Sequence, residues 1–147
     1  MKVKECMCNQ VSWVEPQTTL SDVAKIMQKE HVGCIPVCDT NQTIVGLVTD
    51  RDIVLRGVAC NKDTNTTPVS EIMTTNVYTI SANDEVTDAS KLMTDWQIKR
   101  VPVIENARIV GIITLGDLTN TKGVDGRQAY HTLEGINQNG TNAQNAE

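Results

Sequence analysis

The chain has 147 residues, of which 39% are hydrophobic and 21% are charged, and it carries a formal net charge of −5. This balance is typical of a soluble globular protein and excludes a disordered chain, and no apolar run reaches the length that a bilayer requires. The acidic balance argues against a broad nucleic-acid surface, which needs clustered Lys and Arg to neutralise phosphates. Any site for an anion must therefore be local.

The first residues of the chain are basic, but no apolar stretch with a small-residue cleavage site follows them, so no signal peptide is predicted. We therefore expect a cytoplasmic protein. Five cysteines form an odd set and are expected to remain reduced in that compartment. They are Cys6, Cys8, Cys34, Cys38 and Cys60.

An internal repeat organises the chain, because apolar, Gly, Thr and Asp positions recur in the same order in its two halves. The matching segments are Val3–Met7 with Val69–Met73, Ile35–Val37 with Val101–Val103 and, after a one-residue deletion, Ile44–Asp52 with Ile109–Asp117. We predict a first repeat over residues 3–58, a linker over 59–68, a second repeat over 69–120 and a polar tail over 121–147. Because each repeat is too short to bury a full core, we expect the two to stabilise one another.

The elements of the first half are predicted from its matches and its turn residues. A helix should follow the apolar strand Ile44–Thr49, with Thr49 or Asp50 as its cap and Gly57 at its end. The linker after it is rich in Asn, Thr and Asp and should tether the halves.

The second half gives the clearer signals. Val77–Ile80 is rich in strand formers, and in 86–96 five apolar residues recur at helical spacing, which predicts one buried helix face. These five are Val86, Ala89, Leu92, Met93 and Trp96. Two strands, Arg100–Ile104 and Ile109–Thr114, should form a hairpin, and a second helix should begin near Thr114. In the tail, a short helix is possible at Arg127–Leu133.

A doubled strand-helix-hairpin-helix unit resembles the CBS-domain family. Its strongest local pieces are Val45–Ile53, which contains the Gly-x-x-Thr-x-x-Asp pattern, and Lys99–Val103, which contains Pro-Val. The resemblance covers roughly residues 3–120 and implies an α/β fold of tandem CBS domains packed about a pseudo-twofold axis, of the stand-alone two-repeat type. It further implies two clefts that accept adenosine-containing ligands, and assembly into a homodimer.

The residues themselves agree with a nucleotide site. A Thr at a strand end and an Asp three residues later present a hydroxyl and a carboxylate at one point, and a carboxylate can accept hydrogen bonds from both ribose hydroxyls. The alternative is that both residues merely cap a helix. By resemblance, the ligand contacts are Thr49, Arg51, Asp52, Val77, Tyr78, Ile98, Lys99, Arg100, Thr114 and Asp117.

The resemblance implies that the two clefts differ. The first combines Thr49 and Asp52 with Val77, Tyr78, Ile98, Lys99 and Arg100, whereas the second combines Thr114 and Asp117 with Val11, Val32, Gly33 and Cys34. Arg100 can fork onto phosphate oxygens, and Lys99 adds a point charge. Cys34 stands where Arg100 would be, so the first cleft is the better predicted phosphate site. The alternative is that both cations are solvated surface charges.

Three other readings compete with nucleotide sensing. A metal site would draw on His31 and four of the cysteines, but their spacing is poor for structural zinc, so no metal is predicted. An enzyme is not predicted, because no nucleophile elbow, Walker loop or dinucleotide turn is present. A structural dimerisation module with empty clefts stays open.

The expected function is therefore a regulatory module that binds AMP, ADP or ATP and needs no cofactor. S-adenosylmethionine or NAD is the alternative ligand. Without a fused effector domain, we expect the chain to report to a separate, unidentified protein, and we expect neither nucleic acid nor membrane as a partner.

Overall fold

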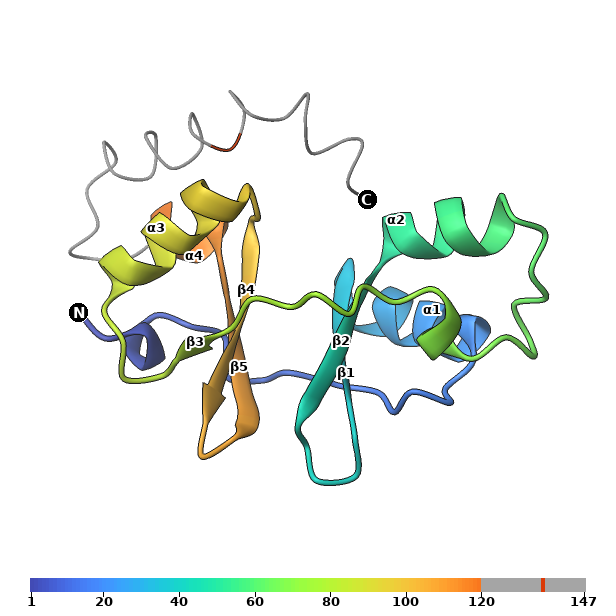
Figure 1. Ribbon diagram of the computed structural model, residues 1–147, viewed down its shortest axis with the longest axis horizontal. Helices are drawn as coiled ribbons and strands as arrows, with labels where there is room; N and C mark the ends of the chain where they lie inside the picture. Colours follow the sequence, from blue (N-terminus) through green and yellow to red (C-terminus); the bar gives the residue numbers. More distant parts are fainter. Residues whose placement is uncertain (120–135, 137–147) are drawn as a thin grey trace. The chain divides into compact units, whose positions relative to one another are not determined.

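The computed structural model describes residues 1–119 and 136, and their elements alternate as expected for a doubled α/β protein (Figure 1). The possible helix at 127–133 lies outside the described residues. In chain order the elements are η1 (Val3–Glu5), α1 (Leu20–Glu30), β1 (Cys34–Cys38), β2 (Ile44–Thr49), α2 (Asp50–Asp52), the π-helix η2 (Ile53–Val58), η3 (Val69–Glu71), β3 (Ile80–Ser81), α3 (Val86–Trp96), β4 (Arg100–Glu105), β5 (Arg108–Thr114) and α4 (Leu115–Thr119).

The chain forms two compact units. Unit 2 is Val11–Val77, with the antiparallel hairpin β1-β2. Unit 1 combines Met1–Gln10 with the residues from Tyr78 onward, and its sheet has the order β3-β4-β5, with β3 parallel to β4 and β4 antiparallel to β5. Both hairpins shift register at matching places, after Val37 and after Val103, so the repeat extends to the irregularities of the strands.

Each unit contains a segment from the other repeat. In unit 1, Val3 is fully buried in the core, and its amide donates to the carbonyl of Asp84 at 2.8 Å. In unit 2, the matching Val69 is fully buried, and its amide donates to the carbonyl of Thr18 at 2.7 Å. The repeats have thus exchanged their first turns, so each core contains residues of both repeats.

The glycine of each Gly-x-x-Thr motif lets the exchanged segment approach its strand. A Cβ on Gly46 would lie 2.6 Å from the sulfur of Met73, and a Cβ on Gly111 would lie 2.7 Å from the carbonyl oxygen of Cys8. Backbone pairing follows at both places, since Leu47 and Thr74 exchange amide hydrogen bonds of 2.9 and 2.8 Å. Only glycine has room for this contact.

The helices begin and end for identifiable reasons. Thr19 caps α1 by accepting from the amide of Asp22, and His31 ends it in the left-handed conformation at φ 57°. Gln97 ends α3 in the same way at φ 56°. The predicted helix Val86–Trp96 is confirmed in its bounds.

Four local predictions need correction. Trp96 is 53% exposed rather than core, because it is the last residue of α3 and lies where the helix leaves the packed face. The strand predicted at Val77–Ile80 is reduced to Ile80–Ser81, where it pairs with β4.

Gly57 does not end its helix but is buried within η2. The linker does more than tether, since the carbonyl of Thr67 caps the amide of Leu20 at 3.1 Å.

Candidate functional site

The first and last residues of the motif Thr49–Asp52 hydrogen-bond to each other at the junction of β2 and α2. The amide of Asp52 donates to Thr49 Oγ1 at 3.0 Å, and the amide of Thr49 donates to Asp52 Oδ2 at 2.9 Å. Thr49 and Asp52 therefore cap the start of the helix, and Asp52 is only 8% exposed. The cap uses only part of the hydrogen-bonding capacity of these two side chains, because each oxygen keeps a second lone pair and the threonine hydroxyl can still donate.

The second motif repeats this geometry in unit 1. The amide of Thr114 donates to Asp117 Oδ2 at 2.8 Å, and the amide of Asp117 donates to Thr114 Oγ1 at 3.1 Å. Asp117 is less buried than Asp52. A hydroxyl and a carboxylate are thus held in fixed geometry twice in the chain, which is what a polar ligand site requires.

The residues before Pro-Val lie beside the motif of their own repeat. In unit 1, the register places Arg100 opposite Thr114, and the carbonyl of Lys99 accepts from the amide of Leu115 at 2.8 Å. In unit 2, Cys34 stands opposite Thr49. Lys99 and Arg100 are both exposed, so each cation is accessible to a ligand.

The predicted contacts divide between the two units. Unit 2 holds Thr49, Arg51, Asp52 and Val77, with Val11, Val32, Gly33 and Cys34, whereas unit 1 holds Tyr78, Ile98, Lys99, Arg100, Thr114 and Asp117. The structure brings Lys99, Arg100 and Thr114 together within unit 1. Each predicted cleft draws on both units, so its full composition stays a prediction.

Two further residues next to these positions were missed by the sequence analysis. Trp96 stacks on Tyr78 with the ring centroids 4.3 Å apart and the planes at 19°. Arg56 lies with Nη1 3.8 Å from Asp52 Oδ1 and donates to the carbonyl of Ile72 at 3.2 Å. The i, i+4 spacing of Asp52 and Arg56 was the available signal for the second contact.

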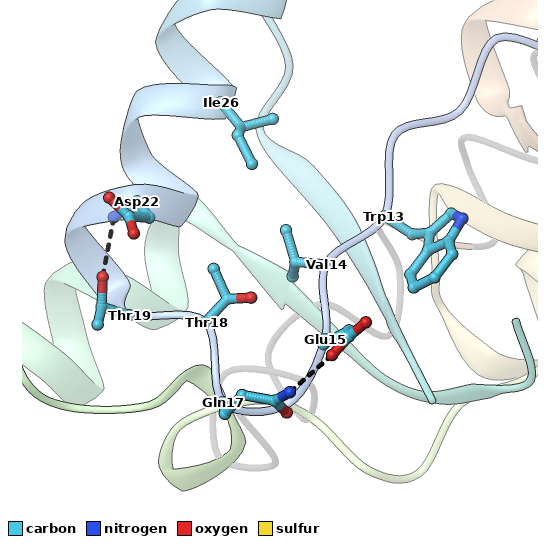
Figure 2. Close-up of a pocket in the computed structure, with 8 residues that line it drawn as sticks. All are labelled: Trp13, Val14, Glu15, Gln17, Thr18, Thr19, Asp22 and Ile26. Carbon is cyan, nitrogen blue, oxygen red and sulfur yellow. Dashed lines mark hydrogen bonds between the residues drawn. The ribbon is translucent and has the colours of Figure 1, made fainter. Parts of the chain in front are cut away.

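A groove of different character lies in unit 2, between the loop 13–19 and α1 (Figure 2). It is lined by Trp13, Val14, Glu15, Gln17, Thr18, Thr19, Asp22 and Ile26. None of the predicted ligand contacts is among them. The carboxylates of Glu15 and Asp22 disfavour a phosphate here, so this groove does not suit a nucleotide.

All five cysteines lie in residues 1–119, and none of them forms a disulfide within that range. Within the part of the chain that the structure describes, no three His, Cys, Asp or Glu side chains come together as a metal site. Nor does any helix found there have the length and apolar character needed to cross a membrane.

Cys38 is fully buried, and this burial, helped by the charge of Asp39, raises the pKa of its thiol to about 11. Because the folded pKa lies above the unfolded value, stability is complete below about pH 9 and falls as the pH rises towards 11, by at most roughly 2 to 3 kcal/mol. We expect wild type to lose stability relative to Cys38→Ala over this range in urea titrations. An unchanged difference between pH 8 and 11 would contradict the burial of this thiol.

Comparison with known proteins gives the same picture. The CBS domain model matches residues 3–58 and 69–122. The CBS domain-containing protein YhcV of Bacillus subtilis is 42% identical over 116 residues, which cover 79% of this chain and 81% of that protein.

Two solved structures are also similar. Hypoxic Response Protein I, crystallised with two coordinated zinc ions, has a TM-score of 0.77 and 32% identity over 83% of this chain and 99% of its own. The CBS domain pair of protein MJ0100, in complex with methylthioadenosine and S-adenosyl-L-methionine, has a TM-score of 0.72 and 30% identity over 81% and 97%. With the doubled motif, the exchanged turns and these matches in agreement, the chain belongs to the CBS domain family, as a tandem pair of CBS repeats.

Proposed function

We propose that this CBS pair is a regulatory module that senses AMP, ADP or ATP and has no catalytic activity. The observation that carries the proposal is the reciprocal Thr–Asp cap, which holds a hydroxyl and a carboxylate rigidly at the same point of both repeats. A rigid acceptor loses little entropy when it binds a diol, so it suits ribose.

Asp52 is proposed to hold the ribose. Its Oδ2 is engaged by the amide of Thr49, while its Oδ1 faces Arg56 at a distance longer than a hydrogen bond. Oδ1 can therefore accept from a ligand hydroxyl without breaking the cap. Thr49 keeps its hydroxyl hydrogen as a donor, since its oxygen serves the cap only as an acceptor.

Lys99 and Arg100 are proposed to bind the phosphates of a ligand held at Thr49 and Asp52. Both are exposed, and the chain has an overall charge of −5, so an anion needs local cations of this kind. The matching positions of the first repeat are Gly33 and Cys34, which carry no charge. We therefore propose that the ligand site with Thr114 and Asp117 binds nucleotides more weakly.

The adenine ring is proposed to lie against Tyr78, with Val77 and Ile98 completing an apolar wall. Trp96 stacks on one face of Tyr78 and holds the tyrosine ring in place beside Val77 in the sequence. This contact would contribute affinity by burial while discriminating little between mono-, di- and triphosphates.

The adenosyl class is supported by the MJ0100 pair, whose crystal structure holds methylthioadenosine and S-adenosyl-L-methionine. These ligands share the ribose and adenine of AMP but lack its phosphate. A sensor of S-adenosylmethionine or NAD is the alternative, whereas methylthioadenosine has no anionic group and would give Arg100 no partner.

A thermal-shift panel of AMP, ADP, ATP, adenosine, NAD, S-adenosylmethionine and methylthioadenosine tests the proposal. We expect the adenine nucleotides to raise the melting temperature more than adenosine does, because the latter has no phosphate for Arg100. A shift with S-adenosylmethionine alone would favour the alternative sensor. If no member of the panel shifts it, the proposal is wrong and a structural dimerisation module is favoured.

Homodimerisation is proposed through the outer face of η2. Its side chains Val54, Leu55 and Val58 are 55%, 45% and 56% exposed, a cluster of apolar area that an isologous partner would cover. We expect Leu55→Lys to weaken the dimer at least roughly tenfold, because it buries a charge. Light scattering at micromolar concentration measures this, with Ala24→Lys, on an exposed position of α1, as the control. A monomeric wild type would contradict the proposal.

A further inference from the structure

Arg56 connects the proposed ribose carboxylate to the exchanged turn of the second repeat. Its Nη1 lies 3.8 Å from Asp52 Oδ1 and donates a 3.2 Å hydrogen bond to the carbonyl of Ile72. Ile72 is 2% exposed and follows η3 in the core of unit 2. One guanidinium nitrogen therefore faces both a motif of the first repeat and the start of the second.

The two distances differ in a way that suits ligand binding. The contact to Ile72 is a hydrogen bond, whereas the contact to Asp52 is an ion pair too long to be one. The Ile72 carbonyl thus holds the cation near the carboxylate without occupying its oxygen. A buried carboxylate needs such a partner, and the Asp52 side chain is only 10% exposed.

We infer that Arg56 is a positioning residue for the proposed ribose site. Through Ile72, it couples ligand binding at Asp52 to the stability of the turn Val69–Met73. The inference rests on the proposed function. The second repeat has Thr121 at the matching position, so Asp117 lacks an arginine in this place of its sequence.

Arg56→Gln tests the inference, with Lys62→Gln as the matched control. Lys62 pairs with Glu71 at 3.2 Å, so the control removes one cation that holds the same turn but does not contact Asp52. We expect Arg56→Gln to weaken AMP and adenosine equally, by roughly threefold to tenfold, as losses within one salt-bridge network do. Arg56→Lys should recover part of the affinity, and Lys62→Gln should change neither.

The equal effect on adenosine separates positioning from a general loss of charge, because an arginine that only attracted phosphate would affect AMP alone. Unchanged or tighter adenosine binding in Arg56→Gln, or equal weakening in Lys62→Gln, would overturn the inference.

Amide hydrogen exchange tests the coupling itself. AMP should slow exchange at the amides of Val69, Ile72 and Met73 in wild type and in Lys62→Gln, but not in Arg56→Gln at a saturating ligand concentration. Protection that persists in Arg56→Gln overturns the inference while the proposed function stands. If wild type binds no adenosyl ligand, the proposed function fails. The positioning role is then overturned too, unless Arg56→Gln and Asp52→Asn each speed exchange at Ile72 without ligand and the double variant speeds it by less than the sum of the two effects.

Discussion

Residues 69–147 produced alone should be far less stable than the intact chain. This fragment contains all of unit 1 except Met1–Gln10, and it therefore lacks Val3, whose fully buried side chain contributes about 1.5 to 3 kcal/mol. It also loses two hydrogen bonds, which the amides of Val3 and Cys8 donate to the carbonyls of Asp84 and Ile112. A domain of total stability near 5 to 15 kcal/mol would lose a large share of it.

Urea denaturation of the fragment, the intact chain and a rescue fusion would measure the effect. In the fusion, residues 1–10 are joined by a flexible Gly-Ser linker to residues 78–147, which restores every segment of unit 1. We expect the fusion to unfold cooperatively and the fragment to show a lower midpoint or none. A fragment as stable as the fusion would show that the exchanged turn contributes nothing.

Asp52→Ala should weaken AMP binding tenfold or more, because it removes charge-assisted hydrogen bonds to ribose that contribute about 1.5 to 3 kcal/mol. The substitution also removes the acceptor for the amide of Thr49, which could lower stability. Asp52→Asn keeps an oxygen for that amide and removes the charge, so it isolates the ligand effect. Folding of each variant is checked by its melting temperature without ligand.

Asp117→Asn is the matched substitution in the second repeat, since its carboxylate makes the same cap. We expect it to affect AMP binding less than Asp52→Asn, because its predicted cleft has Gly33 and Cys34 in place of cations. Loss of AMP binding in Asp117→Asn with none in Asp52→Asn would show that the wrong motif has been chosen.

The sequence was sufficient for the elements that depend on local pattern. The helix Val86–Trp96 follows from apolar spacing, and the caps at Thr49 and Thr114 follow from residue type. It was not sufficient for the exchange of first turns, because Val3 and Val69 are apolar in either arrangement and an internal repeat does not say which core each one enters.

The candidate site shows the same division. The pairing of Arg100 with Thr114 depends on strand register, which the matched hairpins predict. The contacts of Arg56 with Ile72 and of Trp96 with Tyr78 join residues 16 and 18 positions apart. Periodicity reports which face of one element is buried, and it carries no information about a polar contact between two elements or about a side chain at the end of a helix.

Calorimetric titration of AMP and adenosine into wild type and Arg100→Ala tests nucleotide sensing most directly. Our account predicts saturable binding of both ligands to wild type, with AMP weakened about tenfold in Arg100→Ala and adenosine unchanged, because only AMP has a phosphate for the guanidinium. Absence of saturable heat with AMP in wild type, or equal weakening of both ligands in Arg100→Ala, would contradict it.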